Sequence, residues 1–418
     1  MLRLVHTADV HLGARHADLG EAAAAQRERQ FAAFKASVDL ALLEKVDLFL
    51  IAGDLFDSNV QPRRTVDRVA AELARLSASR IRTVIAPGTH DVYDRSSVYR
   101  AYDLPQLAGA RAEDMVTVLT PDKPDALIET CDALVVGRPF DTKRAPHSPL
   151  RDMTAAAARG TATWKIGLLH AALAIPGRTD GDDIVITTDE IAASGLDYLA
   201  LGHWHSGQTA KAGNVTYGYS GAPEPVAVDQ DRAGRVLVVT FDERNGKRTV
   251  KAEQRTVGRT RFEHVELDAA DLASQPALIE KLARRADPDL VLDVRLTGVR
   301  PDELDVDVEE VEAALRPGFL RVRVRDASLP ALTAGTIPPP DTIAGAFIRD
   351  LESRIAELEA SPEARPAARA ARAASRNGRG DAAANRDGTG DLPAADAAEL
   401  RDALRLGRLL LAGHEVTL

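Results

Sequence analysis

The side chains of this sequence that could do chemistry are aspartates and histidines, gathered in short clusters that each follow an apolar, strand-like run. The clusters are Asp9-Val-His11, Gly53-Asp-Leu-Phe-Asp57, Gly88-Thr-His-Asp91, the single His170 and Gly202-His-Trp-His205. In an open α/β sheet, ligands bind beyond the carboxyl ends of the strands. Five strands that deliver Asp and His to one such edge would build a single polar site from distant parts of the chain.

The residue types indicate a metal site. Imidazole and carboxylate groups without thiolates suit divalent Mn, Fe or Zn, and one ion is satisfied by three or four protein ligands. Seven plausible ligands exceed that number and indicate two ions that share a carboxylate; they are Asp9, His11, Asp54, His90, His170, His203 and His205. Two ions about 3.5–4 Å apart are the usual arrangement for phosphoester hydrolysis.

Each cluster on its own has an ordinary structural explanation. An Asp-x-His after a strand is usually only a turn, and Gly-Asp-x-x-Asp is a common helix entry with Asp as the N-cap. A lone histidine such as His170 is more often a satisfied, partly buried side chain than a ligand. Gly202-His-Trp-His205 is the strongest element, because alternation along an extended backbone places both rings on one face. The prediction therefore depends on the conjunction of all five clusters.

The elements that must position these clusters form a layered α/β pattern over roughly the first 240 residues. Amphipathic stretches at Gln30–Glu44 and Thr65–Leu76 separate the first three apolar runs and predict helices. The Asn245-Gly246 dipeptide at the centre of a later turn predicts a hairpin. The strands that we expect are Leu2–Val5, Val46–Ala52, Ile81–Ala86, Ala133–Val136, Lys165–Leu169, Leu196–Leu201, Val236–Phe241 and Thr249–Thr256.

The rest of the chain divides into a small module and a C-terminal region. Residues 259–330 favour strand, helix, strand, helix and strand, which predicts compact α+β material. Pro338-Pro-Pro340 predicts a stiff linker, followed by a helix around Ile343–Leu358. Residues 359–391 contain no Leu, Ile, Val, Phe or Met and predict a tether without a core, before apolar periodicity returns at Ala397–Leu411.

Composition bounds the class of protein. The chain has 418 residues, 45% apolar and 28% charged, which suits two or three globular domains and excludes collagen-like, fully disordered or membrane-embedded chains. Because the net charge is −10, attraction to phosphate could only come from local basic patches. Cys131 is the only cysteine, and no stretch reaches the ~18 apolar residues that span a bilayer. We therefore expect a cytoplasmic protein with no membrane partner.

In their order, the five clusters resemble the calcineurin-like metallophosphoesterases. Four segments are similar to the SbcD-type DNA repair exonuclease subunits, nearest to a divergent bacterial branch; they are His6–Gly13, Ala52–Asp57, Leu199–His205 and Tyr219–Glu224. The resemblance implies an α/β fold with a four-layer αββα catalytic domain at 1–258. It also implies a small α+β capping domain at 259–330, and a linker, tether and C-terminal helix at 331–418.

The same resemblance implies a role for each residue. Asp9, His11 and His205 would bind one metal, His170 and His203 would bind the other, and Asp54 would bridge the two ions. His90 would act beside the scissile phosphate as the catalytic acid, and Asp57 would orient the ring of His90. The implied cofactors are two divalent ions, most often Mn, and the implied activity is DNA phosphodiester hydrolysis by the nuclease subunit of an SbcCD-like repair complex. The partners would be DNA and an SbcC-type coiled-coil ATPase, with a homodimer left open.

Thr89 departs from the family pattern. The family carries Asn at this position, where the side-chain carbonyl binds the second metal, and a Thr hydroxyl is a shorter ligand. Two alternatives therefore stay open: a metallophosphoesterase that acts on a small phosphoester, and a weakly active scaffold that binds DNA and an ATPase. The module at 259–330 favours the nuclease over a minimal phosphatase, whereas Thr89 keeps the scaffold in consideration.

Overall fold

The computed structural model describes residues 1–17, 19, 23–109, 114–145, 147–175, 179, 184–225, 230, 232–301, 304–329, 339, 342–360, 400, 403, 404, 406, 407 and 410. The chain separates into two compact units. The first contains residues 1–263 with 287–291 and 319–321, and the second contains 264–286, 292–318 and 322–418. The predicted tether at 359–391 and most of the predicted helix at 397–411 lie outside the described residues.

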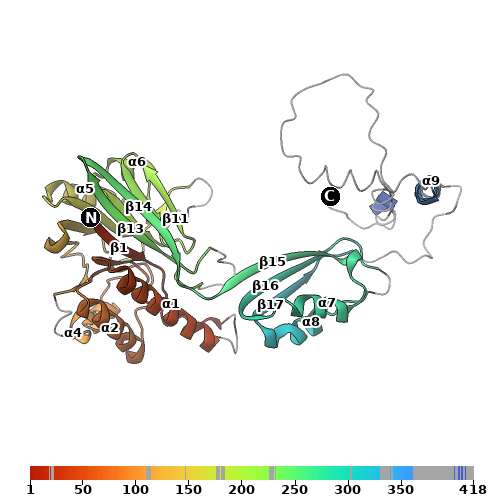
Figure 1. The fold of residues 1–418 in the computed structure, drawn as a ribbon, viewed down its shortest axis with the longest axis horizontal. Coiled ribbons are helices and arrows are strands. Elements are labelled where there is room, and N and C mark those ends of the chain that lie inside the picture. Colours follow the sequence, from red (N-terminus) through yellow and green to blue (C-terminus); the bar gives the residue numbers. More distant parts are fainter. Residues whose placement is uncertain are drawn as a thin grey trace, which may run out of the picture. The chain divides into compact units, whose positions relative to one another are not determined.

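The first unit contains two six-stranded sheets (Figure 1). In the first sheet, β1 to β4 are parallel neighbours, and the hairpin of β13 and β14 adds to the free side of β1 in antiparallel fashion. All five residues of β2 are buried, as expected for a parallel strand covered on both faces. The strands are β1 (Leu2–Thr7), β2 (Leu48–Ala52), β3 (Arg82–Ala86), β4 (Val116–Val118), β13 (Arg235–Arg244) and β14 (Lys247–Thr256).

The second sheet has the order β11-β12-β10-β7-β6-β5, with a parallel centre and an antiparallel strand at each edge. Its strands are β5 (Asp125–Ile128), β6 (Ala133–Gly137), β7 (Trp164–His170), β10 (Tyr198–Gly202), β11 (Gln208–Ala212) and β12 (Val215–Tyr219). A short pair of strands, β8 (Ala172–Leu173) and β9 (Val185–Ile186), lies outside both sheets.

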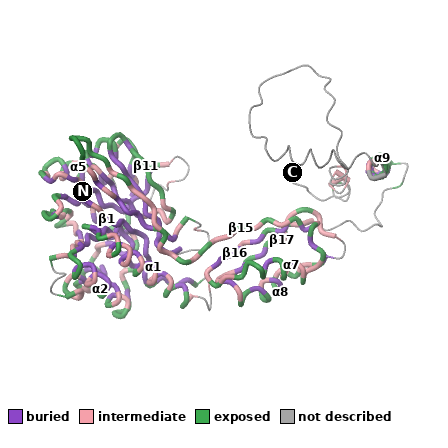
Figure 2. The backbone as a smooth tube through the Cα atoms, viewed as in Figure 1, coloured by how far each residue is buried: buried purple, intermediate pink, exposed green. Residues whose placement is uncertain are grey.

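Three apolar clusters show that the sheets and helices form four layers. The central cluster joins side chains of both sheets, such as Leu50, Ile166 and Tyr198, all fully buried. A second cluster packs the first sheet against α1 and α2, and a third packs the other face of the second sheet against α5 and α6. Figure 2 shows the buried strands between more exposed helices. The helices are α1 (Ala23–Glu44), α2 (Arg63–Ala78), α3 (Val98–Ala101), α4 (Leu104–Leu107), α5 (Leu150–Arg159) and α6 (Thr188–Ala193).

The second unit contains helices α7 and α8 and most residues of the strands β15, β16 and β17, which pair as a three-stranded sheet. Ser274 caps α7 and Asp307 caps α8 by accepting a backbone hydrogen bond, so both helices begin at residues that favour an N-terminus. The bounds are β15 (Arg261–Asp268), α7 (Gln275–Ala283), β16 (Asp287–Thr297), α8 (Val308–Leu315), β17 (Phe319–Asp326) and α9 (Ile343–Ala360). None of the helices among the described residues is long and apolar enough to cross a membrane.

The predicted α/β sandwich is confirmed, and the differences have local causes. Helix α1 begins at Ala23, seven residues before the predicted start at Gln30, although its first two turns lack large apolar side chains. Buried amides replace apolar packing there: Gln26 donates to the carbonyl of Pro225, and Gln30 bonds both His16 and the carbonyl of Val10. An apolar periodicity cannot reveal a helix that is anchored in this way.

Candidate metal centre

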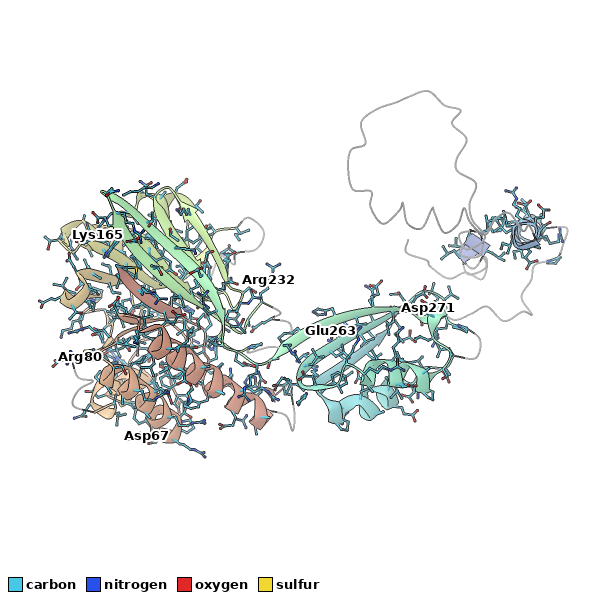
Figure 3. All side chains as sticks on the ribbon, viewed as in Figure 1. Asp67, Arg80, Lys165, Arg232, Glu263 and Asp271 are labelled. Carbon is cyan, nitrogen blue, oxygen red and sulfur yellow. The ribbon has the colours of Figure 1, made fainter. Side chains whose placement is uncertain are left out.

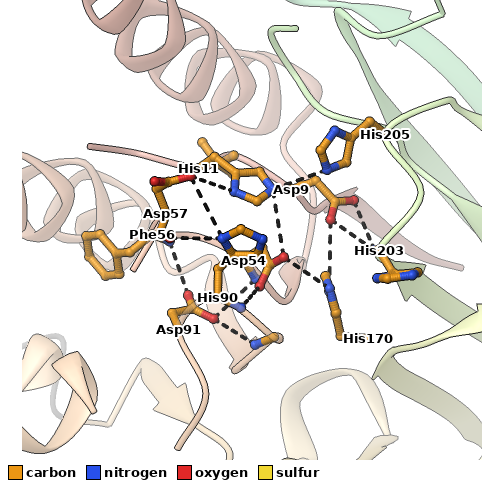
Figure 4. A network of polar contacts seen from close by, with 12 residues as sticks. Asp9, His11, Asp54, Phe56, Asp57, His90, Asp91, His170, His203 and His205 are labelled. Carbon is orange, nitrogen blue, oxygen red and sulfur yellow. Dashed lines mark hydrogen bonds and ion pairs between the residues drawn. The ribbon is translucent and has the colours of Figure 1, made fainter. Parts of the chain in front are cut away.

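The predicted site residues come together where the parallel strands of both sheets end. Asp9 and His11 follow β1, Asp54 and Asp57 follow β2, and His90 follows β3 in the first sheet. In the second sheet, His170 is the last residue of β7, and its register partner Gly202 directly precedes His203, with His205 two residues further along. Figure 4 shows all eight side chains around one centre.

The backbone at this centre adopts left-handed conformations that L-amino acids avoid. The φ angles are 54° at Asp9, 49° at His11, 52° at Asp54 and 101° at His203. Such a residue costs about 1–3 kcal/mol and persists only where its surroundings hold it. Backbone bonds do so here, because Asp9 N–H donates to the carbonyl of Gly53 at 3.1 Å and His11 N–H donates to that of Asp54 at 3.0 Å. Strain concentrated on these residues indicates that their positions serve function.

Asp9, His11 and His205 form the first donor group. The Nε2 atoms of His11 and His205 lie 3.2 Å apart, and the Nδ1 of His11 lies 3.3 Å from the carboxylate of Asp57. If Nδ1 of His11 donates to Asp57, its Nε2 presents a lone pair toward His205. The carboxylate of Asp9 lies within 4.8 Å of both ring nitrogens and accepts hydrogen bonds from the backbone N–H of His203 at 2.9 and 3.2 Å. Three donors that converge in this way suit a cation.

His170 and Asp54 give the clearest sign that this centre suits a cation. Nδ1 of His170 bonds the carbonyl of Ala52 at 2.9 Å, so Nδ1 carries the proton and Nε2 of a neutral ring carries a lone pair. That buried Nε2 has no hydrogen-bond partner, yet it lies 3.2 Å from Oδ2 of Asp54. A lone pair facing a carboxylate oxygen is repulsive unless the ring is protonated or a metal ion lies between them. The same Oδ2 lies 3.7 Å from Nε2 of His11, so Asp54 faces both donor groups.

The pKa shifts describe the same charge balance. Burial by itself lowers the pKa of His170, but the carboxylates of Asp54 and Asp9 outweigh it and raise the pKa to about 10. Burial opposes ionisation of Asp54, but His170 and His11 lower its pKa overall. Burial lowers the pKa of His205 and favours its neutral, metal-binding form. The centre thus contains buried carboxylates that require a compensating positive charge, which divalent ions would supply.

His90 differs from the other histidines because 47% of its side chain is exposed. Its Nδ1 lies 2.9 Å from the main-chain carbonyl of Asp57 and 3.9 Å from the Asp57 carboxylate. The carboxylate lies closer to His11, and the hydrogen bond from His11 is the main reason that the pKa of Asp57 is lowered. Asp57 therefore contacts His90 chiefly through its backbone, and Nε2 of His90 is left to meet a ligand from solvent.

Asp91 is a residue of this centre whose role the sequence did not reveal. Its buried carboxylate accepts bonds from the backbone N–H groups of Gly88 at 2.7 Å, Phe56 at 3.1 Å and Asp54 at 3.3 Å. It also accepts a bond from the hydroxyl of Tyr99 at 2.6 Å. These contacts lock the loop after β2 to the loop after β3 (Figure 4). The only signal was its place beside His90 in the Gly88–Asp91 cluster.

Two glycines are required because strands of different sheets approach closely here. Gly53 has φ +88°, and a Cβ on it would overlap the ring of His170. A Cβ on Gly202 would overlap the carbonyl of Ala52, which accepts the bond from His170. Because Gly53 and Gly202 lack a Cβ, the ring of His170 can occupy its position between the sheets.

Thr89 is half-buried and directly precedes His90. The backbone N–H of His90, the next residue, donates to Oδ1 of Asp54 at 2.8 Å. Thr89 thus directly precedes the backbone group that binds Asp54. Its effect on a second ion therefore stays a prediction.

On the side of His205, the centre opens into a cavity of about 790 Å³. Its lining includes His203, His205, Gln230 and Arg232, and Arg232 is labelled in Figure 3. The amide of Gln230 contacts Nδ1 of His205, which leaves Nε2 directed toward His11. The lining also includes the apolar side chains of Ile175 and Trp204, and Arg232 gives the cavity a positive charge that suits an anionic ligand.

The segment Tyr219–Glu224 is hydrogen-bonded to the backbone of the Gly202–His205 cluster. Ala222 N–H donates to the carbonyl of His205 at 3.0 Å. The buried carboxylate of Glu224 accepts bonds from the backbone of Arg259 at 2.8 Å and Thr260 at 3.1 Å. Glu224 thus fixes the path of the chain directly before β15.

The sequence pattern of the calcineurin-like phosphoesterase family matches residues 2–207, which include all eight predicted site residues. Residues 2–207 belong to this family. The order of motifs that predicted the calcineurin-like phosphoesterase domain is therefore confirmed by an independent comparison.

Several curated proteins are similar to this chain. The DNA double-strand break repair protein Mre11 of Aeropyrum pernix is 28% identical over 237 residues, 55% of each chain. Mre11 of Methanopyrus kandleri is 25% identical and covers 81% of this chain and 79% of its own. An uncharacterized metallophosphoesterase of Bacillus subtilis, YhaO, is 27% identical over 53% of this chain and 52% of its own. The chain thus spans about half the length of two of these three relatives.

Proposed function

We propose that this calcineurin-like phosphoesterase hydrolyses DNA phosphodiesters at a two-metal centre. The observation that carries the proposal is the position of Asp54, whose Oδ2 lies 3.2 Å from Nε2 of His170 and 3.7 Å from Nε2 of His11. One carboxylate between two donor groups is what a bridged pair of ions requires. The names of the Mre11 relatives support DNA as the substrate.

The donor set fits two divalent ions. Asp9, His11 and His205 would hold one ion, His170 and His203 would hold the other, and Asp54 would hold both. Nitrogen and carboxylate donors without sulfur suit Mn²⁺, which we propose as the metal. When bound, the ions would polarise the phosphoryl group and activate a water molecule.

The chain's own residues supply the proton chemistry. The carbonyl of Asp57 fixes the proton of His90 on Nδ1, so a charged ring has a second proton on the exposed Nε2. That proton can pass to the leaving oxygen of the substrate, as a general acid requires. The T-shaped contact with His11, with ring centroids 4.6 Å apart, limits rotation of the His90 ring.

Metal content and hydrolysis together test this proposal. Crystals soaked in Mn should show two anomalous peaks beside Asp54, and the protein should hydrolyse bis-p-nitrophenyl phosphate and linear DNA until EDTA is added. Asp54→Asn should lower metal content and reduce activity roughly a hundredfold or more. Asp103→Asn is the matched control, because Asp103 is the exposed N-cap of α4 and Asn caps a helix equally well.

Each outcome has a defined meaning. Hydrolysis of the small diester without any action on DNA would replace the nuclease by a phosphoesterase for small substrates. Two bound ions without hydrolysis of either substrate would favour a scaffold. A folded protein that binds no Mn, Co, Ni or Zn would exclude the metal centre itself.

We further propose an SbcC-type coiled-coil ATPase as partner. Helix α9 supports this, because Ile348, Leu351 and Ile355 are buried along one face while Ile343 and Phe347 remain exposed at 92% and 44%. Replacement of Phe347 by Asp should abolish co-purification with the coiled-coil base of such an ATPase while leaving metal content unchanged. Unchanged co-purification would exclude α9 as the docking helix. Light scattering of the purified chain would show whether it forms a homodimer.

A further inference from the structure

Outside the metal centre, the most concentrated positive charge among the described residues that line a cavity lies in a groove between α1 and α2. The groove has a volume of about 380 Å³ and begins at Leu12, the residue after His11. Four arginines line it against a single acidic residue, Glu28; they are Arg15, Arg27, Arg64 and Arg68. Such a concentration stands out in a chain whose net charge is −10.

Two of these arginines are fixed by the fold. Arg68 donates two hydrogen bonds to Glu28, at 2.9 and 2.7 Å, and its guanidinium lies 3.6 Å from the centre of the Phe31 ring. Arg27 donates to the carbonyl of Arg15 at 3.1 Å. The single carboxylate of the groove is therefore already satisfied by Arg68, and its lowered pKa, caused first by that hydrogen bond, keeps it ionised.

The other two arginines are available. Arg15 and Arg64 are exposed and form no ion pair with the described residues, although Arg64 lies close enough to Glu28 to help lower the pKa of that carboxyl. Exposed guanidinium groups that are not neutralised bind phosphate oxygens in bidentate fashion. Arg15 and Arg64 thus add two positive charges on the solvent side of the groove.

The groove is connected rigidly to the metal centre. Leu12 N–H donates to the carbonyl of Leu55 at 3.0 Å, and Asp57 N–H donates to the carbonyl of Leu12 at 3.1 Å. The first residue of the groove is therefore hydrogen-bonded to the loop that carries Asp54 and Asp57. A polymer with regularly spaced phosphates, held at the centre by one phosphate, could place its neighbouring phosphates in this groove.

We propose that the groove between α1 and α2 binds the phosphate backbone of the nucleic-acid strand whose scissile phosphate lies at the metal centre. This inference rests on the proposed nuclease function and adds the path of the substrate. The contacts are with the backbone, so binding should depend strongly on salt and little on base sequence.

The test measures DNA binding without hydrolysis. Anisotropy of a fluorescein-labelled oligonucleotide, single-stranded or duplex, is followed in EDTA at several salt concentrations. Each lost phosphate contact lowers the slope of log affinity against log salt by about one, and at about 0.1 M salt weakens binding roughly tenfold. The double variant Arg15→Ala/Arg64→Ala should therefore lose about two from the slope.

The controls separate charge from position. Arg151→Ala/Arg159→Ala removes two exposed arginines from α5, in the outer layer of the other sheet, and should leave the slope unchanged. Arg15→Lys/Arg64→Lys keeps the charge and should retain most of the binding. Unchanged Mn content and melting temperature show that the alanine variant is folded around an intact centre.

Two results would contradict the proposal that this groove binds DNA, and both can be told apart from failure of the proposed nuclease function. The groove is wrong if the Arg15/Arg64 alanine pair binds DNA like the wild type, or if the α5 pair loses as much affinity. Hydrolysis of bis-p-nitrophenyl phosphate by the wild type tests the function separately, because that small diester does not need the groove. If the wild type binds DNA without hydrolysing it and the Arg15/Arg64 alanine pair loses that binding, the result supports the groove and rejects the nuclease.

Discussion

The substitution Asp91→Asn gives the sharpest test of how the centre is held together. Asp91 is buried, and its two oxygens accept four hydrogen bonds, from the N–H groups of Gly88, Asp54 and Phe56 and the hydroxyl of Tyr99. Asn has the same shape, but its amide nitrogen can only donate. The substitution therefore changes hydrogen bonding and charge without creating a cavity.

The magnitude follows from the geometry. The amide oxygen can keep Gly88 and Asp54, which share Oδ1, while the amide nitrogen replaces Oδ2. The hydroxyl of Tyr99 can rotate to accept from that nitrogen, but the N–H of Phe56 cannot and is left buried without a partner. One unpaired N–H costs about 1–3 kcal/mol, and the loss of charge weakens the remaining bonds. We expect the free energy of unfolding to fall by about 3 kcal/mol.

Urea unfolding in EDTA measures this change, and Mn titration measures its effect on the centre. The affinity for Mn should also fall, because Asp91 holds the loop of Asp54. Asp103→Asn, at the exposed N-cap of α4, is the matched control and should change neither quantity. Burial and the nearby Asp54 raise the pKa of Asp91. A loss below about 1 kcal/mol with unchanged Mn affinity would refute the reasoning.

Three further predictions concern the centre and the core beneath it. Thr89→Asn should restore a carbonyl ligand for the second ion and strengthen its binding by on the order of 1 kcal/mol, or several-fold, so the half-maximal rate should occur at lower Mn; an unchanged Mn dependence would show that the site is already complete. His90→Ala should remove most activity and keep the metal, whereas His203→Ala should lower metal content; equal metal loss would make His90 a ligand. Burial lowers the pKa of His6 to about 3 from 6.5, so the unfolded chain takes up a proton first as pH falls below 6.5, and stability should decline between pH 6.5 and 3. Between pH 7 and 5 this histidine should account for about 2 kcal/mol of the loss in unfolding free energy. Urea unfolding across this pH range should show that His6→Gln lacks this contribution, and parallel pH profiles for the wild type and the variant would contradict the assignment.

Buried parallel strands were the predictable part of the fold. Leu48–Ala52 and Tyr198–Gly202 are entirely buried and apolar, so they stand out as strands in the sequence. The edge strand β11 (Gln208–Ala212) was not predicted, because four of its five residues are exposed and carry no apolar alternation. A strand that is stabilised mainly by backbone hydrogen bonds to its neighbour has no distinctive residue composition, so the sequence does not predict it.

The candidate site was predictable in its residue types but not in its supports. Polar side chains directly after apolar runs indicated where Asp54 and His170 would meet. The left-handed backbone of Asp9 and the main-chain contact from Asp57 to His90 depend on tertiary hydrogen bonds. The role of Asp91 also needed the structure, because a carboxylate that binds backbone N–H groups has no sequence pattern of its own.

The pairing of β1 with β13 has a consequence for biosynthesis. Leu2 lies opposite Phe241, so β1 keeps an unpaired side during synthesis until the chain has been translated past β13. A chain that ends at residue 207 would contain every proposed ligand and the whole family match, yet it would expose that side of β1. An open, apolar strand edge is a template for aggregation. We therefore expect the solubility of the nascent protein to depend on translation continuing well beyond the last proposed ligand.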